Sequence, residues 1–234
     1  MRDDPEQATG PGAPSPGTRT GLNLQRVLTA ALHIADTEGL EALSMRRLAQ
    51  SLNREAMTLY RYAPNKAALL DGIVDLVLSP LAVDPDAADW RAELRTVGRR
   101  FRDLAQAHPN VVPLLATRPE ATPLGLRPVG TLQTLEDFLE LLTRAGFTPS
   151  DALHAYRLFF GFLHGHIVSE LHETAQPPEE TELLLRLHLR HLPATRFRQL
   201  RGLTHELVHY DGPAQLQHSI ERMITGLQRF QPRT

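Results

Sequence analysis

Residues 43–69 read LSMRRLAQSLNREAMTLYRYAPNKAAL, and this stretch decides the fold of the chain. Its apolar residues recur at helical spacing in two short runs, which are separated by Asn53 and Arg54 and closed by Pro64. Asparagine tolerates the left-handed backbone conformation better than other non-glycine residues, so Asn53 suits a tight turn between two helices. Two short helices joined by such a turn, with basic and polar side chains at its edge, are typical of a helix-turn-helix unit that reads DNA.

The second helix of this unit, expected over residues 55–62, carries the side chains that we expect to contact DNA. Arginine bonds guanine edges and the methyl groups of Thr and Met contact thymine, so outward-facing residues of these types are candidate base readers. They are Arg54, Ala56, Met57, Thr58 and Arg61. The candidate phosphate contacts, which set position rather than sequence, are Arg46, Tyr60, Tyr62 and Lys66. Arg54 is explained equally well as a solvated surface charge.

Lysine is almost absent from this chain, and its one occurrence is at Lys66; the other 24 of the 25 basic residues are arginine. Residues 22–68 hold six basic residues and four acidic ones, although the chain as a whole has a formal charge of -2. The acidic excess therefore lies outside the helix-turn-helix, as expected if only one end of the molecule meets phosphate.

Helical patterns extend on both sides of this unit. Asn23 and Gly39 bound one expected helix, and Asn65 begins another that ends at Ser79 and Pro80. Further helices are expected at 90–107, 110–117, 127–145, 150–173, 181–191, 194–209 and 214–230. No segment alternates in the manner of a half-buried strand, so the predicted class is all-α.

Three regions follow from these patterns. Residues 1–21 are rich in Pro and Gly and poor in large apolar side chains, so we expect a disordered tail. Residues 22–68 form the expected three-helix DNA-binding domain, and residues 69–234 form a larger helical domain for ligand binding and dimerisation.

Composition excludes several classes of protein. No window reaches the ~18 consecutive apolar residues of a membrane helix, and the N-terminus lacks the order of a signal peptide, so we expect a cytoplasmic protein. The chain has no cysteine, which excludes disulfides, thiolate metal sites and cysteine nucleophiles.

The segment from Leu24 to about Leu76 resembles the N-terminal domain of the TetR family of bacterial transcriptional repressors, through MRRLAQSL, LYRY and NKAALLDGI. The chain departs from the family pattern at the turn, which usually reads Gly-Val and here reads Asn53-Arg54. The resemblance implies a regulator, not an enzyme, that binds double-stranded operator DNA. Whether it represses or activates is left open.

Residues 69–234 resemble the C-terminal domain of the tetracycline-repressor branch, through Trp90, Phe101, the 117–119 and 134–136 runs and the 150–173 helix. The resemblance implies a homodimer in which helices 150–173 and 214–230 of two copies form a four-helix bundle. It also implies a two-state mechanism, in which an effector moves helix 65–78 and thereby the two recognition helices.

The tetracycline site itself is poorly retained. By resemblance, its two imidazoles fall on Ala82 and Leu114, its amides on Val97 and Phe138, and its metal-linked carboxylate on Ser169. No magnesium-drug chelate or other cofactor is therefore implied, and the expected effector is a small, largely apolar organic molecule. The expected pocket residues are Ala82, Val97, Phe101, Leu104, Leu114, Thr117, Phe138, Leu142 and Phe160. Each of them is explained equally well as a core residue.

One motif points to another function. Residues 205–209 read HELVH, which matches the H-E-x-x-H signature of zinc metalloproteases, with two imidazoles on one helix face and Glu206 as general base. The third histidine of the longer signature falls on Gln215, and no strand-rich domain is predicted, so we expect no metal at this site. The alternatives to a regulator are this zinc enzyme and a helical dimer without ligand.

Overall fold

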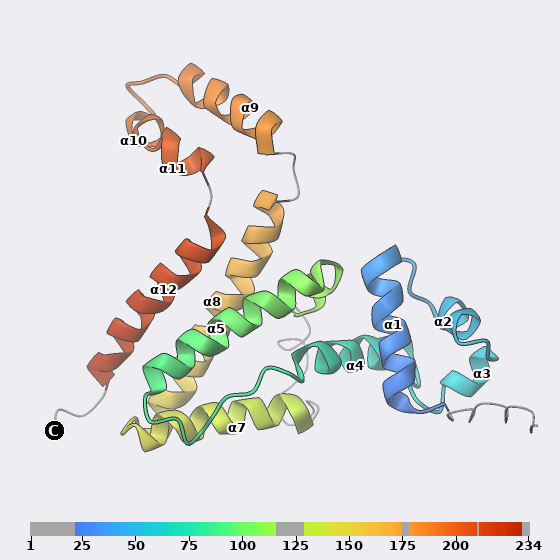
Figure 1. Cartoon of the computed structure of the whole chain (residues 1–234). Coiled ribbons are helices and arrows are strands. Elements are labelled where there is room, and N and C mark those ends of the chain that lie inside the picture. The colour runs from blue at the N-terminus through green and yellow to red at the C-terminus, as the bar shows by residue number, and fades with distance from the viewer. Residues whose placement is uncertain (1–21, 116–128, 175–177, 210, 231–234) are drawn as a thin grey trace, which may run out of the picture.

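The computed structural model describes residues 22–115, 129–174, 178–209 and 211–230, and every regular element in these ranges is a helix (Figure 1). This confirms the all-α prediction. The expected tail at 1–21 lies outside the described residues. None of the helices in the described ranges combines the length and apolar character needed to cross a bilayer.

The first three helices form a separate unit at one end of the molecule. They are α1 (Leu24–Glu38), α2 (Met45–Ser51) and α3 (Ala56–Leu59). The predicted caps are confirmed, because the Asn23 side chain accepts from the Arg26 amide at 2.8 Å and the Ser44 hydroxyl accepts from the Arg47 amide at 3.1 Å. Each cap satisfies an amide that has no partner within its helix, and so sets where that helix begins.

The third helix is shorter than the predicted 55–62. It ends at Leu59, because the amides of Tyr62 and Ala63 both bond to the Leu59 carbonyl and turn the chain. The Tyr62 side chain also points toward the residues before α1, where its hydroxyl donates to the Leu22 carbonyl at 2.7 Å. Tertiary contact and the approaching Pro64 thus override the helical spacing of this segment.

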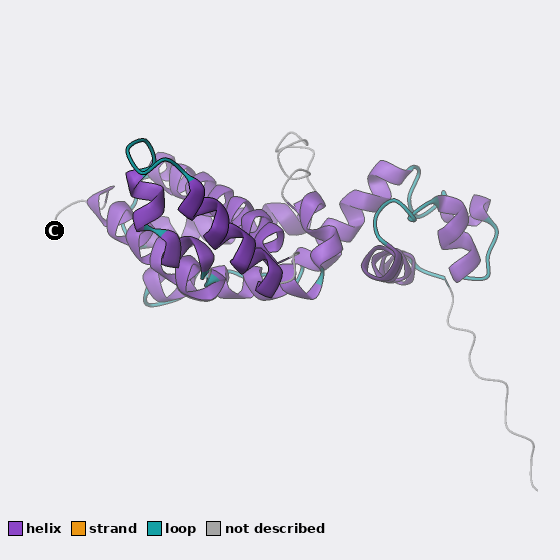
Figure 2. Cartoon of the chain, turned by 90° about the horizontal axis from the view of Figure 1, so that it is seen from above, coloured by secondary structure: helices purple, strands orange, loops and turns teal. Residues whose placement is uncertain are grey.

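The fourth helix, α4 (Lys66–Leu78), connects the two parts of the molecule. Its buried residues are Leu69, Ile73, Val74 and Val77, and it contacts α1 as well as α5 and α7. The view in Figure 2 shows the α1–α3 unit standing off from the remaining helices, with α4 leading from one to the other. The predicted boundary between residues 68 and 69 falls inside this helix, and the division into domains remains a prediction.

The larger part packs four long helices around an aromatic core. They are α5 (Trp90–Ala107), α7 (Val129–Arg144), α8 (Pro149–Thr174) and α12 (Gly212–Leu227). A short helix, η1 (Pro109–Val111), follows α5, and η3 (Gln228–Phe230) follows α12. Phe101, Phe138 and Phe159 are among the largest side chains that are fully buried here.

Three helices project beyond the ends of α8 and α12 (Figure 1): α9 (Pro178–His191), α10 (Arg198–Gly202) and α11 (Thr204–Val208). The prediction of one helix over 194–209 was wrong, because the chain breaks at Leu203. Gly202 has low helix propensity, and the Thr204 hydroxyl donates to the Arg201 carbonyl at 2.8 Å, a local bond of the kind that competes with backbone helix bonds.

The last helix begins two residues before the predicted 214–230. Its first residue is Gly212, which is buried. A Cβ atom at this position would lie 2.2 Å from Oε1 of Glu170, so any other residue here would have to displace a buried carboxylate that is bound to Arg102.

Candidate nucleic-acid interface and ligand cavity

The turn between α2 and α3 has the geometry that its sequence predicts. Asn53 has φ of 51°, in the left-handed region, and it is the one non-glycine residue of the described ranges with positive φ. The Arg54 amide then bonds to the Ala49 carbonyl at 2.9 Å. Leu48 of α2 and Leu59 of α3 are fully buried against the core, so their helices are held from inside while the opposite side of α3 meets solvent.

Six of the nine predicted DNA contacts are exposed to solvent. Met57 is 75% exposed, which is unusual for a large apolar side chain and is explained if the surface meets another molecule. The exposed candidates are Arg46, Arg54, Met57, Tyr60, Arg61 and Lys66. Ala56, Thr58 and Tyr62 are half-buried. The nine residues thus belong to one end of the molecule, and their role in DNA contact remains a prediction.

Two side chains of this unit serve its own structure. The bond from Tyr62 to the Leu22 carbonyl uses the phenolic proton, so this residue fixes the start of α1 and is not a free donor toward phosphate. Arg47 binds Glu38 at the end of α1 with two hydrogen bonds of 3.0 and 2.5 Å. The hydrogen bond from Arg47 lowers the pKa of Glu38, so the pair stays ionised and ties α2 to α1.

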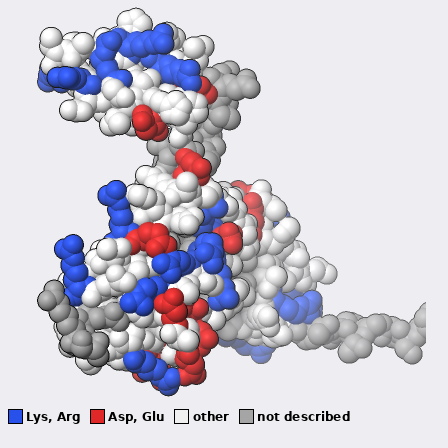
Figure 3. Space-filling model, turned by 60° about the vertical axis from the view of Figure 1, so that its left-hand side comes forward, with Lys and Arg blue, Asp and Glu red and all other residues white. Residues whose placement is uncertain are grey.

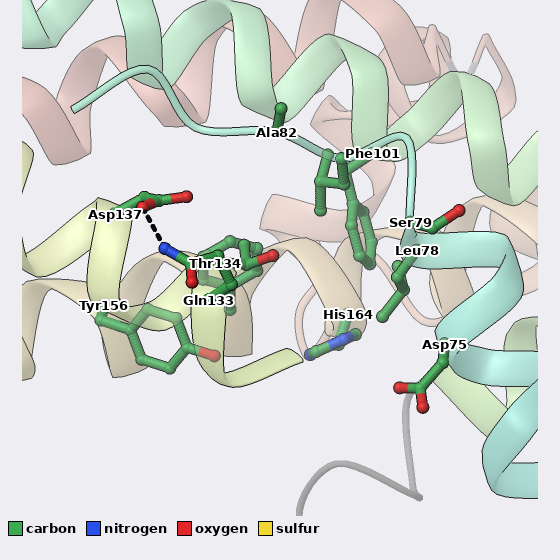
Figure 4. Close-up of a pocket in the computed structure, with 12 residues that line it drawn as sticks. Asp75, Leu78, Ser79, Ala82, Phe101, Gln133, Thr134, Asp137, Tyr156 and His164 are labelled. Atoms are coloured by element: carbon green, nitrogen blue, oxygen red, sulfur yellow. Dashed lines mark hydrogen bonds between the residues drawn. The ribbon is translucent and has the colours of Figure 1, made fainter. Parts of the chain in front are cut away.

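A cavity of about 270 Å³ lies where α4, α5, α7 and α8 meet (Figure 4). This volume is near the lower end of the range of small-molecule sites, roughly 300–1,000 Å³. Its lining is Asp75, Leu78, Ser79, Leu81, Ala82, Phe101, Gln133, Thr134, Asp137, Tyr156, Phe160 and His164. The end of α4 is therefore one wall of the cavity.

Aromatic rings form a second wall. Phe101 packs edge-on against Phe160 and His164, and its ring centroid lies 6.4 and 5.2 Å from theirs. The ring centroids of Tyr156 and Phe160 lie 4.8 Å apart. Phe138 is fully buried behind this wall and contacts both Tyr156 and Phe160. Such a wall offers ring faces and edges to a flat apolar ligand.

The cavity also has a polar side that the sequence did not reveal. Gln133 donates to Asp137 at 2.8 Å, and the side chains of Thr134, Tyr156 and His164 surround the same space (Figure 4). Asp75 enters from α4, within the otherwise apolar run from Ile73 to Leu78. A carboxylate within an otherwise apolar helical run is a sequence signal from which this polar side could have been predicted.

The expected pocket residues are distributed between the cavity, the core and the rest of the chain. Those that line the cavity are Ala82, Phe101 and Phe160. Val97, Phe138 and Leu142 are fully buried core residues, while Leu104 and Leu114 are half-buried against that core. Thr117 lies outside the described residues. Their contact with an effector remains a prediction.

The HELVH segment forms α11 and the residue after it. The rings of His205 and His209 stack with centroids 4.3 Å apart, and Nδ1 of His209 bonds to the His205 carbonyl at 2.9 Å. In the part of the chain that the structure describes, no group of three or more His, Asp or Glu side chains is placed to hold a metal ion.

Comparison with known families assigns both parts of the chain. Residues 27–73 match the family described as "Bacterial regulatory proteins, tetR family", and residues 82–230 match "Tetracyclin repressor-like, C-terminal domain". The two matches together span most of the chain, and the second alone covers more than half of it.

Individual relatives agree with this assignment. The chain is 36% identical over 162 residues to the HTH-type transcriptional repressor DrrR1 of Streptomyces coeruleorubidus; the match covers 68% of this chain and 58% of the relative. It is 28% identical over 221 residues to the tetracycline repressor protein class D of Escherichia coli, covering 88% and 89%.

Among solved structures, the fold is similar to that of ActR, a TetR family protein of Streptomyces coelicolor, in complex with actinorhodin. The TM-score is 0.77 at 28% identity, and the match covers 89% of this chain and 96% of ActR.

Proposed function

This chain belongs to the TetR family of bacterial transcriptional regulators, and we propose that it represses by binding a palindromic operator as a homodimer, which a small organic effector releases. Members of this family are transcriptional regulators, so the chain is not an enzyme and the zinc-protease alternative is rejected. Because operator DNA lies in the bacterial cytoplasm, we infer that the protein acts there.

The observation that carries the proposal is the position of α4. Lys66, its first residue, lies at the surface with the candidate DNA contacts, and Asp75 and Leu78 near its other end line the cavity. A ligand in the cavity therefore touches the same helix that leads to the DNA-reading unit. A ligand that binds one position of α4 better than another shifts the population toward that position.

A movement of α4 affects operator binding through spacing. Two recognition helices of a dimer enter successive major grooves about 34 Å apart on one face of the duplex. A change of a few ångströms in their separation prevents the second helix from docking once the first has docked, and affinity falls.

The homodimer is proposed to form through α8 and α12. The outer side of α8 carries Leu158, which is 54% exposed, and the exposed Gly161 and Gly165. A Cβ atom at either glycine would meet nothing within 4 Å in the described chain, which leaves room for a partner helix. Small residues at this spacing allow two helices to approach closely. Leu158→Glu is expected to convert the dimer to a monomer in light scattering, whereas Leu183→Glu on α9 leaves it intact.

The effector is proposed to be a flat, largely apolar aromatic molecule with a few polar groups. The ring wall of Phe101, Tyr156 and Phe160 supports the apolar part, and Gln133 and Asp137 support the polar groups. ActR, whose structure was solved with actinorhodin, supports this chemical class.

The DNA step is tested by fluorescence anisotropy with duplexes from the region flanking the chain's own gene. We expect one site with two-fold symmetry to bind much more tightly than shuffled DNA, and binding to weaken as salt rises. Arg54→Ala and Thr58→Ala are expected to relax base preference by about 1–3 kcal/mol at single positions. If no flanking duplex is preferred over shuffled DNA, the operator proposal is wrong.

The effector step is tested with actinorhodin as the probe. We expect it to lower operator affinity, and Ala82→Leu, which fills the cavity edge, to weaken that effect without changing affinity for DNA. Ala88→Leu is the matched control, because Ala88 is exposed in the same connection between α4 and α5 and does not line the cavity. Equal responses of the two variants would contradict this placement of the effector.

A further inference from the structure

A second cavity, of about 300 Å³, lies between α5 and α12. Its apolar side is formed by Leu216 and Ile220, which are buried, and its rim carries the arginines Arg95, Arg99, Arg100 and Arg102. We call this cavity the arginine groove. None of its lining residues is shared with the effector cavity described above.

Two of the four arginines are already neutralised. Arg95 binds Glu221 of α12 with two hydrogen bonds of 2.5 and 2.8 Å, and the bond from Arg95 lowers the pKa of Glu221. Arg102 binds Glu170 of α8 at 2.5 Å, with 16% and 5% of the two side chains exposed. These pairs join α5 to its neighbours and fix the two ends of the groove.

The other two arginines are not neutralised. Arg99 and Arg100 are exposed, and neither lies within 4 Å of a carboxylate in the described ranges. Both donate to neutral oxygens: Arg99 donates to the Thr96 hydroxyl at 3.2 Å and Arg100 to the Ala82 carbonyl at 3.4 Å. The lining of the groove contains one acidic residue, Asp103.

Figure 3 shows the surface of the molecule below the α9–α11 projection. Basic and acidic side chains are interspersed on this surface. The groove differs from such a mixed surface, because two adjacent guanidinium groups at its edge have no carboxylate partner among the described residues. A guanidinium offers several donors in a fixed plane, which matches a carboxylate or phosphate.

We propose that the arginine groove is a second ligand site, which binds a small amphipathic organic anion, with its acid group at Arg99 and Arg100 and its apolar body on Leu216 and Ile220. A polar anion without an apolar part would make no use of the apolar side of the groove, and a neutral apolar molecule would leave the guanidinium groups without an acceptor. Only a ligand with both parts satisfies the whole lining.

The groove and the effector cavity are adjacent through α5. Phe101 points into the effector cavity, while its neighbours Arg100 and Arg102 line the groove. Arg100 also holds the carbonyl of Ala82, whose side chain lines the effector cavity. An anion that binds Arg100 competes with that carbonyl, so a control variant of the effector cavity must leave Ala82 unchanged.

The proposal is tested by titration calorimetry of the full chain with 1-naphthoate, and with 1-naphthamide as a neutral ligand of the same shape. We expect 1-naphthoate to bind more tightly than 1-naphthamide and more weakly as salt rises. Arg99→Gln is expected to weaken 1-naphthoate binding about tenfold, because a charge-assisted hydrogen bond is lost, and Arg99→Lys to restore part of it.

Two control variants separate the sites. Arg190→Gln removes an exposed arginine of α9 outside the groove, and Gln133→Leu changes the effector cavity at α7; both are expected to bind 1-naphthoate as the unchanged protein does. Circular dichroism confirms that each variant is folded. Absence of binding, equal binding of the two ligands, or loss of binding in Gln133→Leu but not in Arg99→Gln would each overturn the proposal.

Discussion

Nδ1 of His108 lies 2.9 Å from Oδ2 of Asp36, and this contact joins the end of α5 to α1 across 72 residues of sequence. A carboxylate oxygen can only accept, so Nδ1 carries the proton. Asn110 adds two bonds beside it, because its amide nitrogen donates to the carbonyls of Ala35 and Asp36 at 3.1 and 3.0 Å. The larger part of the molecule therefore binds the end of α1 directly through hydrogen bonds, and α4 makes a second connection between that part and the α1–α3 unit.

Asn110→Ala is expected to destabilise the protein by about 1–2 kcal/mol, because the Asp36 carbonyl loses the Asn110 donor and the Ala35 carbonyl keeps only the Gly39 amide. Urea unfolding followed by circular dichroism measures the change. Gln25→Ala, at an exposed position near the start of α1, is the control and is expected to have no effect. Equal stability of Asn110→Ala and the unchanged protein would show that this contact contributes nothing to the fold.

Lys66→Ala is expected to weaken binding to every DNA sequence alike, because a phosphate contact carries no base information. The slope of the logarithm of affinity against the logarithm of salt concentration is expected to fall by about one. Tyr60→Ala should lower affinity in the same uniform way, and Lys66→Arg should preserve it. If Lys66→Ala changed preference between sequences, the residue would be a base reader and the placement of α3 on the duplex would need revision.

Gly212→Ala is expected to destabilise the protein by about 1–3 kcal/mol, because its Cβ would meet the buried Glu170 carboxylate that also binds Arg102. Gly202→Ala is the control: nothing lies within 4 Å of its Cβ, and alanine favours a helix. Thermal unfolding distinguishes them, with a lower midpoint for Gly212→Ala and an unchanged or higher one for Gly202→Ala. The reverse order would contradict the close approach of α12 to α8.

His166 is expected to make the protein less stable in mild acid. Burial lowers the pKa of His166 below its ordinary value of 6.5, although Glu170 opposes the shift. The unfolded chain therefore binds more protons than the folded chain just below pH 6.5, and stability falls as the pH drops through this range. Above pH 6.5 both states are neutral at this residue, and the effect vanishes.

Urea unfolding at several pH values between 5 and 8 measures this dependence. His166→Gln should flatten it, while His154→Gln, at an exposed position on the same helix, should not. An unchanged pH slope in His166→Gln would assign the acid sensitivity to another group.

Much of the DNA-reading unit was predictable because its determinants are local. Asn23, Ser44 and Asn65 cap their helices with bonds that span three residues, and Asn53 adopts the left-handed conformation that its side chain tolerates. These interactions involve residues close together in the sequence, so reading the chain in order is enough to expect them. The length of α3 was missed because Tyr62 bonds to Leu22, 40 residues away.

The sequence by itself thus determined that the chain is all helical, where most helices begin, and which end carries the DNA-reading turn. Only the tertiary structure decided which side chains share a cavity, because Asp75, Gln133 and Tyr156 come from three helices and meet through the way these helices pack. It also decided the contact of His108 with Asp36 and the pairing of Arg102 with Glu170. Helix periodicity specifies a face within one helix, whereas the crossing of helices specifies which faces meet.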